Sequence, residues 1–390
     1  MYGIIIRGNK VNIVIAGCGF AGLHALGQLK DLLGKISGLR ILVFDKNDYA
    51  TMIPSLPDLA GMRIEGEFLT EKIRTFIPAG AELKKGKVVS VNLHESQVQT
   101  ETGAYSYDYL VIATGSVTNF YGFNQHTDRI YKLDSLENAL RISLDLKKFL
   151  DTNSEPNIAI VGGGYTGIEL AFNLKSLSGK LYKNPGIHII EKGNDILAFL
   201  PEGMRNYVKS KLAQNGFQLI TGVSISEFDG RDISLTNGQK IRDVFLCWCA
   251  GSKFAIPELV GNHKTLGDGR IIANPFLQIG EHPNVFVCGD AAAISHEKGY
   301  LRKAVNFAIY SGTAAGNNLK NLILKKKLKA FKPLDLGWVI PFGNDSMGRI
   351  FNRVNIRGRI GLRLHYFMCG YRNFCLKNTL QYFKKALLLK

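Results

Sequence analysis

The chain has 390 residues, of which 46% are apolar and 42 are glycine, and its formal net charge is +17. These values fit a globular α/β protein of two or three domains and exclude a disordered or fibrous one. No apolar run reaches the roughly 18 residues of a membrane-spanning helix, and no cleavable signal pattern opens the chain.

The first motif follows an apolar run at 11–16, which is typical of a buried parallel strand. The run leads into Gly17-x-Gly19-x-x-Gly22 and a helix predicted through Leu33. The first glycine permits a tight turn, the second admits a pyrophosphate, and the third lets the helix pack on the strand. A second apolar run ends in Asp45, whose carboxylate can accept hydrogen bonds from ribose hydroxyls. The stretch predicts a dinucleotide site and leaves the identity of the dinucleotide open.

The next segments are a loop over 49–61 and an antiparallel ribbon within 81–99. A buried strand then begins at Tyr107 and ends in Ala113-Thr114-Gly115. The small residues at this strand end would let the backbone pass close to a cofactor.

The opening motif repeats after a helix predicted over 135–150 and a polar linker over 151–156. A strand at 157–161 leads into Gly162-Gly163-Gly164-Tyr165-Thr166-Gly167, and a later strand ends in Glu191. The last fingerprint glycine precedes the acidic residue by 24 positions here and by 23 positions in the first motif. Two fingerprints with matching spacing predict two dinucleotide sites. Glu191 favours NADH over NADPH, because a carboxylate repels a 2′-phosphate.

Two further strand ends complete the pattern. The strand over 244–249 ends in Ala250-Gly251, much as the earlier strand ended in Ala113-Thr114-Gly115. The strand over 284–288 ends in Gly289-Asp290, and a helix is predicted from 301 to about 325. A glycine, an aspartate and a helix start in this order suit the ribityl chain of a flavin.

The six cysteines form no Cys-x-x-Cys pair, and the spacing of Cys247 and Cys249 is too short for the usual zinc or dithiol motifs. We expect buried free thiols in a reducing compartment, and the sequence predicts no metal site.

The tail from Ser346 to Lys390 carries ten basic residues and no acidic one. Its apolar residues recur at helical spacing: Leu364, Phe367, Met368, Tyr371, Phe374, Leu376, Leu380, Phe383 and Leu387. A basic amphipathic helix of this kind suits an anionic membrane surface. The alternative is a helix packed on its own domain with a solvated basic face. Nucleic acid is not expected, since no known binding module is present.

Together these motifs resemble the disulfide-reductase-like flavoproteins that bind a nicotinamide dinucleotide, and within them the single-subunit (type II) NADH dehydrogenases. The resemblance rests on both fingerprints, Tyr-Asp-Tyr-Leu-Val-Ile-Ala-Thr-Gly at 107–115 and Val-Phe-Val-Cys-Gly-Asp-Ala-Ala at 285–292. It implies an α/β fold with two Rossmann-like domains and a C-terminal membrane-docking segment. The implied domains are a FAD domain split over 1–118 and 270–330, an NADH domain over 119–269, and the C-terminal segment over 331–390.

The resemblance also implies site residues. Cofactor binding is assigned to Gly17, Gly19, Phe20, Ala21, Gly22, Asp45, Lys46, Val89, Ala113, Thr114, Gly115, Gly289 and Asp290, and to Gly162, Gly164, Tyr165, Thr166, Gly167, Glu191, Ala250 and Gly251. Tyr165 could stack on the nicotinamide or be a plain loop aromatic.

Catalytic roles fall on three residues. Glu169 would lie near the nicotinamide, or would only place a charge at a helix N-terminus. Asn306 and Tyr310 stand where the family usually has glutamines facing the quinone.

The implied activity is that of a peripheral NADH:quinone oxidoreductase on the cytoplasmic face of the cell membrane. Hydride would pass from NADH to non-covalent FAD, and two electrons would pass on to a membrane quinone. One alternative is a related flavoenzyme that uses sulfide as donor or a soluble carrier as acceptor. Another is a flavin-binding sensor with little turnover. A homodimer is left open.

Overall fold

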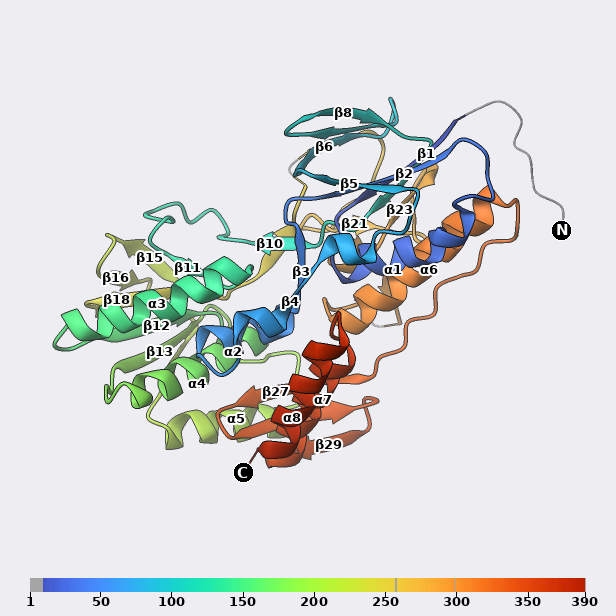
Figure 1. Ribbon diagram of the computed structural model, residues 1–390. Coiled ribbons are helices and arrows are strands. Elements are labelled where there is room, and N and C mark those ends of the chain that lie inside the picture. The colour runs from blue at the N-terminus through green and yellow to red at the C-terminus, as the bar shows by residue number, and fades with distance from the viewer. Residues whose placement is uncertain (1–9, 257, 298, 390) are drawn as a thin grey trace. The chain divides into compact units, whose positions relative to one another are not determined.

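The computed structural model describes residues 10–256, 258–297 and 299–389 (Figure 1). Contacts divide the chain into two compact units, each built from three separate stretches. Unit 1 is Met1–Ala50, Glu71–Val117 and Ser252–Asp335, and unit 2 is Thr51–Thr70, Thr118–Gly251 and Leu336–Lys390. The FAD and NADH domains expected from the sequence remain predictions about the roles of these units.

Unit 1 is organised around a six-stranded sheet. Its strands lie in the order β22 (Gln278–Ile279), β23 (His282–Val287), β9 (Tyr109–Ile112), β1 (Val11–Ala16), β2 (Leu39–Asp45) and β5 (Ala81–Lys85). All neighbours are parallel except β22 and β23. In β1, Ile13, Val14 and Ile15 are all buried, so successive side chains are covered on both faces of the sheet.

Two helices pack together in unit 1, α1 (Phe20–Leu29) and α6 (Val305–Ile323), as Figure 1 shows in blue and orange. Gly312 and Gly316 of α6 face the α1 backbone: a Cβ on Gly312 would collide with the Ala21 carbonyl oxygen, and one on Gly316 would lie 2.5 Å from the Ala25 carbonyl oxygen. The helices can therefore approach this closely only because both α6 positions lack a side chain.

The predicted ribbon within 81–99 is confirmed only in part. β6 (Val88–Asn92) pairs antiparallel with β7 (Gln97–Thr100), which pairs with β8 (Gly103–Ser106). β5 instead extends the main parallel sheet beside β2. Alternation along the sequence predicts a half-buried strand, but it does not identify the partner strand.

Unit 2 contains a second parallel sheet, in the order β11 (Tyr131–Lys132), β18 (Val244–Trp248), β12 (Asn157–Val161), β13 (Gly186–Glu191) and β14 (Gln218–Thr221). Its helices are α3 (Leu136–Thr152), α4 (Tyr165–Lys180) and α5 (Glu202–Gln214). A small antiparallel sheet follows, formed by β15 (Ile225–Phe228), β16 (Ile233–Leu235) and β17 (Lys240–Ile241).

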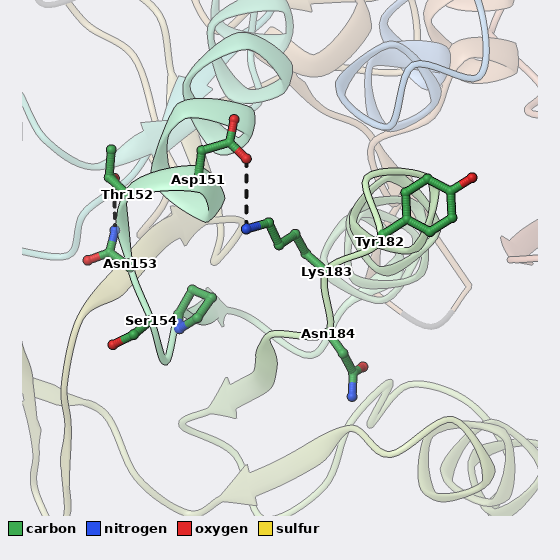
Figure 2. A pocket seen from close by; sticks show the side chains of 8 residues that line it. Asp151, Thr152, Asn153, Ser154, Tyr182, Lys183 and Asn184 are labelled. Atoms are coloured by element: carbon green, nitrogen blue, oxygen red, sulfur yellow. Dashed lines mark hydrogen bonds and ion pairs between the residues drawn. The ribbon is translucent and has the colours of Figure 1, made fainter.

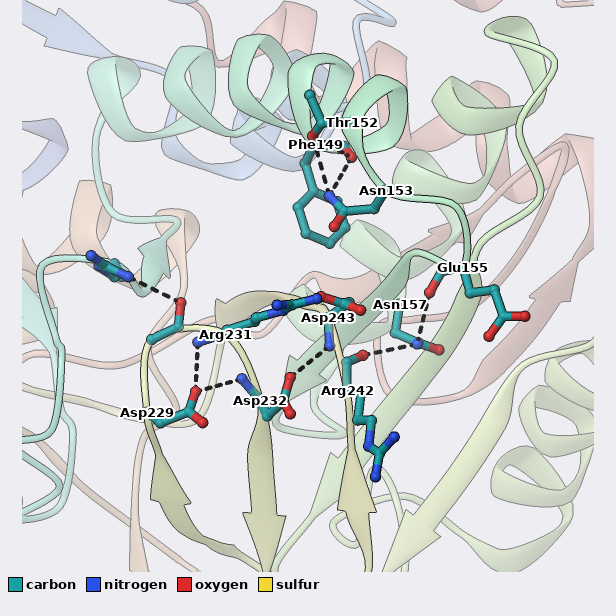
Figure 3. Close-up of polar contacts among 12 residues, drawn as sticks. Phe149, Thr152, Asn153, Glu155, Asn157, Asp229, Arg231, Asp232, Arg242 and Asp243 are labelled. Carbon is teal, nitrogen blue, oxygen red and sulfur yellow. Dashed lines mark hydrogen bonds and ion pairs between the residues drawn. The ribbon is translucent and has the colours of Figure 1, made fainter.

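Polar contacts join the start of β12 to the turns of this small sheet (Figure 3). Asn157 Nδ2 donates to the Arg242 carbonyl oxygen at 3.0 Å, and Asp243 N donates to Asp232 Oδ1 at 2.9 Å. Arg231 pairs with Asp243 on the same edge. The charged side chains of Arg231, Asp232 and Asp243 therefore contact one another or the neighbouring backbone.

The predicted loop over 49–61 is wrong in its second half, which contains helix α2 (Leu56–Ala60). Pro57 lies in the first turn, where a missing N–H costs nothing, and all five residues are buried. The two prolines that suggested a loop are compatible with a helix start.

The C-terminal part of unit 2 is an antiparallel sheet followed by two helices. The strands are β27 (Gly337–Phe342), β28 (Asp345–Ile350) and β29 (Val354–Arg357), and the helices are α7 (Gly358–Tyr371) and α8 (Leu376–Leu388). The prediction of one continuous amphipathic helix is wrong, because the chain turns between Tyr371 and Leu376. α8 packs against α7 at Gly370, where a Cβ would lie 2.8 Å from the Phe383 ring.

The remaining short elements are β3 (Tyr49–Thr51), β4 (Thr70–Lys72), β10 (Ser116–Thr118), β19 (Ser252–Phe254), β20 (Glu258–Val260), β21 (Ile271–Ile272), β24 (Ala292–Ala293), β25 (Ser295–His296), β26 (Gly299–Tyr300), and the 3-10 turns η1 (Lys30–Leu32), η2 (Ile53–Ser55), η3 (Gly66–Leu69), η4 (Ile73–Phe76) and η5 (Gly289–Ala291). Among the described residues, no helix has the length and apolar character needed to cross a membrane.

The contact between α1 and α6 gives a stability prediction. Gly312→Ala places a methyl group against the Ala21 backbone and should lower the free energy of unfolding by about 1–3 kcal/mol. Gly27→Ala is the matched control, because Gly27 lies on α1 with no neighbour within 4 Å of its Cβ direction. This control should be neutral or stabilising by up to about 1 kcal/mol. Thermal denaturation of both variants measures the difference, and equal effects would contradict the packing described here.

Candidate functional site

The first cradle, defined as the loop Gly17–Gly22 together with Asp45, lies in unit 1 between β1 and α1. Gly17 has φ +96°, and a Cβ there would lie 2.5 Å from the Ala113 carbonyl oxygen. A Cβ on Gly22 would collide with the carbonyl oxygen of Gly17. The turn from strand to helix therefore requires glycine at both positions.

The second cradle, defined as the loop Gly162–Gly167 together with Glu191, repeats this geometry in unit 2. Gly162 has φ +109°, and a Cβ there would lie 2.8 Å from the Ala250 backbone nitrogen. A Cβ on Gly167 would collide with the carbonyl oxygen of Gly162. The small residues that end β9 and β18 thus border the two loops in equivalent ways.

The acidic residue of each cradle holds the loop in the same manner. Asp45 Oδ2 accepts a hydrogen bond from Cys18 N at 2.7 Å, and Glu191 Oε2 accepts one from Gly163 N at 2.7 Å. Burial raises the pKa of Asp45, while backbone N–H donors oppose that shift. Each carboxylate therefore lies at the end of its strand and accepts a hydrogen bond from the backbone N–H of the residue that follows the first glycine of the loop.

The helix after each loop begins without a side-chain cap. Gly19 is the N-cap of α1 and Gly164 is the N-cap of α4, and neither helix start has a capping side-chain hydrogen bond. A Cβ on either N-cap glycine would meet no described atom within 4 Å. A helix start of this kind suits an anion such as a diphosphate, which would approach on the open side of the N-cap glycine.

The motif Gly289-Asp290 adds a further wall to the first cradle. Gly289 has φ +66°, its N–H donates to Ser311 Oγ at 2.9 Å, and a Cβ on it would lie 2.8 Å from Ala21 Cβ. Burial raises the pKa of Asp290, and the nearby charges of Lys303 and Arg270 oppose the rise. The predicted neighbourhood of the fingerprint and this remote motif is thus present within unit 1.

Thr114 also fits a cofactor site. Its Oγ1 is buried and finds no hydrogen-bond partner among the described residues. Ala113, just before it, borders Gly17. An unpaired hydroxyl next to a cradle is a suitable contact for a polar ligand group.

The other predicted cofactor residues fall in varied places. Phe20 and Ala21 are buried in α1, Lys46 is exposed, and Val89 is half-buried on β6. In unit 2, Tyr165 and Thr166 form the first turn of α4, and Gly251 follows β18 with φ +71°.

Tyr165 lies in an aromatic group that the sequence did not predict. Its ring centroid is 4.8 Å from that of Phe199 and 5.5 Å from that of Trp338. Phe199 is 60% exposed, so this group presents an apolar surface near the start of α4.

The two residues predicted to face a quinone differ in their surroundings. Asn306 is buried, and its Nδ2 donates to the Leu334 carbonyl oxygen at 3.1 Å. Tyr310, one turn later on α6, is half-buried. The amide nitrogen of Asn306 is therefore already engaged within unit 1.

Glu169 lies in a buried polar cluster of unit 2. Burial and the nearby charge of Asp58 raise its pKa well above the usual range, and Arg63 opposes the rise. One carboxylate oxygen of Asp58, one of Glu169 and one ring nitrogen of His365 lie within 4.8 Å of one another. Asp58 and His365 could not be predicted from the sequence, because they come from remote segments that share no motif with Glu169.

An open depression in unit 2 contains none of the predicted site residues (Figure 2). It is lined by Asp151, Thr152, Asn153, Ser154, Pro156, Tyr182, Lys183 and Asn184. Lys183 and Asp151 form a 3.9 Å ion pair across it. Asp151 and Thr152 are the last two residues of α3, and the other residues follow α3 or α4, so the depression lies at the end of α4 opposite to the second cradle.

Comparisons with known proteins agree with this geometry. The family model for pyridine nucleotide-disulphide oxidoreductases matches residues 11–312. Ferroptosis suppressor protein 1 of Xenopus laevis is 27% identical over 363 residues, which cover 87% of this chain and 88% of that protein. A type II NADH:quinone oxidoreductase of Haemophilus influenzae is 26% identical, with 88% of this chain and 87% of that protein covered.

Two solved structures share the fold. NDH2 from Plasmodium falciparum in complex with NADH superposes with a TM-score of 0.83 at 16% identity, covering 97% of this chain and 98% of that one. The sulfide:quinone oxidoreductase of Aquifex aeolicus gives a TM-score of 0.73 at 20% identity, covering 96% and 92%.

The cradle geometry separates folding from ligand binding. Gly164→Ala should leave the melting temperature unchanged, since its new methyl group meets no described atom within 4 Å. It should weaken dinucleotide binding at least about tenfold, because the methyl group occupies the open side of the helix start. Gly162→Ala should instead lower the melting temperature. Calorimetric unfolding and ligand titration measure the two effects, and a Gly164→Ala variant with unchanged affinity would refute the assignment.

Proposed function

Because the chain belongs to the pyridine nucleotide-disulphide oxidoreductase family, we propose that it is an FAD-dependent NADH:quinone oxidoreductase. The overall reaction is oxidation of NADH with reduction of a quinone to the quinol, with one proton consumed. The observation that carries the proposal is the pair of alike cradles, one in each unit, each closed by its own carboxylate. The names of relatives that match most of the chain supply the quinone as acceptor.

We assign FAD to the first cradle. The glycine turn, the uncapped start of α1, the unpaired Thr114 Oγ1 and Asp290 together fit a ligand with a diphosphate and hydroxyl groups. When bound, FAD supplies the two-electron redox chemistry. The protein would contribute binding and orientation: Asp45 and Asp290 would accept hydroxyl hydrogen bonds, and the start of α1 would face the diphosphate.

We assign NADH to the second cradle. Glu191 would accept ribose hydroxyls and repel a 2′-phosphate, which favours NADH over NADPH. Its present bonds to the Gly163 and Gly193 backbone N–H groups keep it oriented at the end of β13. Tyr165, with Phe199 and Trp338 against it, would provide the apolar contact for the nicotinamide ring.

The state of the cysteines argues against sulfide chemistry. Burial raises the pKa of Cys249 and of Cys288 to about 12. A nucleophilic cysteine must be a thiolate near neutral pH, and these thiols are protonated there. None of the six cysteines forms a disulfide bond.

Quinone contact is proposed for Tyr310 and for the amide oxygen of Asn306, and a role in the protonation of the site is proposed for Glu169. Tyr310 can donate a hydrogen bond to a carbonyl. Glu169 has a raised pKa, so it holds its proton to a higher pH than an ordinary glutamate does. At a given pH it is therefore protonated in a larger fraction of the enzyme molecules.

We also propose that the C-terminal helices dock the enzyme on the cytoplasmic face of the membrane. We call the exposed apolar side chains of α7 and α8 the apolar face: Ile360, Phe367, Tyr371, Leu376, Leu380, Leu387 and Leu388. Exposure of seven apolar side chains to water is unfavourable, and docking of the two helices in the membrane interface would cover them. The exposed Arg359 and Lys384 lie on the same two helices and would attract anionic lipid.

The test of the proposed function is anaerobic titration of the flavin-loaded protein with NADH, followed by a short-chain quinone. NADH should bleach the flavin absorbance and the quinone should restore it. Asp45→Asn should weaken FAD retention about tenfold, with a smaller effect on NADH affinity, whereas Glu191→Gln should raise the KM for NADH and leave FAD bound. Loss of NADH oxidation with every quinone would overturn the proposal, and equal effects of the two variants would overturn the assignment of the cradles.

The membrane proposal is tested by vesicle sedimentation. Leu380→Gln with Leu387→Gln, at side chains that are 56% and 79% exposed, should lower partitioning onto vesicles with anionic lipid. We expect about a tenfold loss, since each leucine gives up apolar burial in the bilayer interface. Leu144→Gln on α3, at a leucine that is 61% exposed, is the matched control and should bind as the unmodified protein does. Unchanged partitioning of the double variant would contradict docking through these helices.

A further inference from the structure

Three buried polar side chains lie close together inside unit 2, and their hydrogen bonds within the fold leave some of their polar atoms unpaired. Asp58 comes from α2, Glu169 from α4 and His365 from α7. One oxygen or ring nitrogen from each lies within 4.8 Å of the other two, and the side chains are 1%, 7% and 7% exposed.

The two carboxylates each carry an oxygen without a partner. Asp58 Oδ2 and Glu169 Oε1 are buried and accept no hydrogen bond from any described residue. A buried carboxylate oxygen left unsatisfied is costly, so two of them in one cluster indicate a missing partner, either a proton or a metal ion.

The other oxygen of Asp58 is fully engaged. Tyr366 OH donates to Asp58 Oδ1 at 3.1 Å, Asn173 Nδ2 donates to it at 3.4 Å, and Arg63 Nε lies 3.6 Å away. These contacts fix the carboxylate and leave Oδ2 free. Outer hydrogen bonds of this kind orient the ligands of metal sites.

His365 supplies the third donor. It is buried, and a neutral imidazole carries a lone pair on one ring nitrogen. Its Nε2 contacts Cys369 Sγ at 3.7 Å. A proton shared between the carboxylates would satisfy two oxygens and give this imidazole no role, whereas a metal ion uses all three donors.

Arg63 and Lys385 also lie beside the cluster. Arg63 donates through Nη1 to Asn173 Oδ1 and the Gly343 carbonyl oxygen, so its guanidinium is directed to these groups as well as to Asp58 Oδ1. Lys385 contacts the Arg63 carbonyl oxygen, and burial lowers the pKa of its amine. Neither cation hydrogen-bonds Asp58 Oδ2 or Glu169 Oε1, so both oxygens stay open to another partner. A bound metal ion would displace the proton that Glu169 otherwise holds.

We propose that Asp58, Glu169 and His365 form a binding site for one divalent transition-metal ion of the zinc class. Two carboxylate oxygens and one imidazole nitrogen match the mixed ligands that zinc takes, with a fourth position left for water. Ligand atoms around such an ion are about 3.4 Å apart, so the side chains would close by up to about 1.4 Å on binding. The ion would join α2, α4 and α7, three segments of unit 2 that are far apart in the sequence.

Equilibrium dialysis of the full-length, flavin-loaded protein against zinc chloride, after removal of metals with a chelator, tests this site. The unmodified protein should bind one equivalent of zinc, and its melting temperature should rise with zinc concentration. Asp58→Asn and His365→Asn should each lose this equivalent and the melting shift.

His188→Asn is the matched control, because His188 is also a buried histidine of unit 2 but lies on β13, where it bonds Asn157. It should retain the zinc. Absence of zinc binding in the unmodified protein would overturn the proposal even if the variants do not fold. Zinc that survives loss of Asp58 would overturn it as well. Both results are independent of NADH oxidation, so failure of this site and failure of the proposed activity are distinguishable.

Discussion

The contact between the first and third glycine of each fingerprint is the constraint on which the rest of the structure depends. Gly22 against the Gly17 carbonyl and Gly167 against the Gly162 carbonyl bring a helix start to the end of a parallel strand. A side chain at either position would push the helix away from the sheet, and the uncapped N–H groups would no longer face the space beside the strand end. Every other part of a cradle is arranged around this point.

Each unit builds its cradle on three adjacent parallel strands, and the three strands are arranged in equivalent ways. β1 lies between β2 and β9, and β12 lies between β13 and β18. In both units, the strand on one side ends in the carboxylate that holds the loop, and the strand on the other side ends in the small residues that border it. A parallel sheet places all three carboxyl ends at one edge, so this equivalence follows from strand order and does not require similar sequences elsewhere.

The strand order also explains what could be predicted from the sequence. The cradles were predictable because a turn of fixed geometry requires glycine at fixed spacing, and because an acidic residue ends the adjacent strand. The position of β5 in the sheet, helix α2 and the break between α7 and α8 could not be predicted from the sequence, since each depends on contacts with distant segments. Asp58 and His365 had no recognisable spacing at all, because a cluster assembled from α2, α4 and α7 leaves no motif along the chain.

The C-terminal tail shows how folding changes the meaning of a charge count. Lys385 points inward, over the Tyr366 ring and against the Arg63 carbonyl oxygen, and Lys377 pairs with Glu67 at 2.9 Å. Arg363 donates to the Leu389 carbonyl oxygen at 3.0 Å. Part of the basic surplus therefore stabilises unit 2 and is not free to attract a surface. The apolar face keeps its exposure on both helices, so for a docking surface built here, buried apolar area would supply most of the affinity and the remaining cations would orient it.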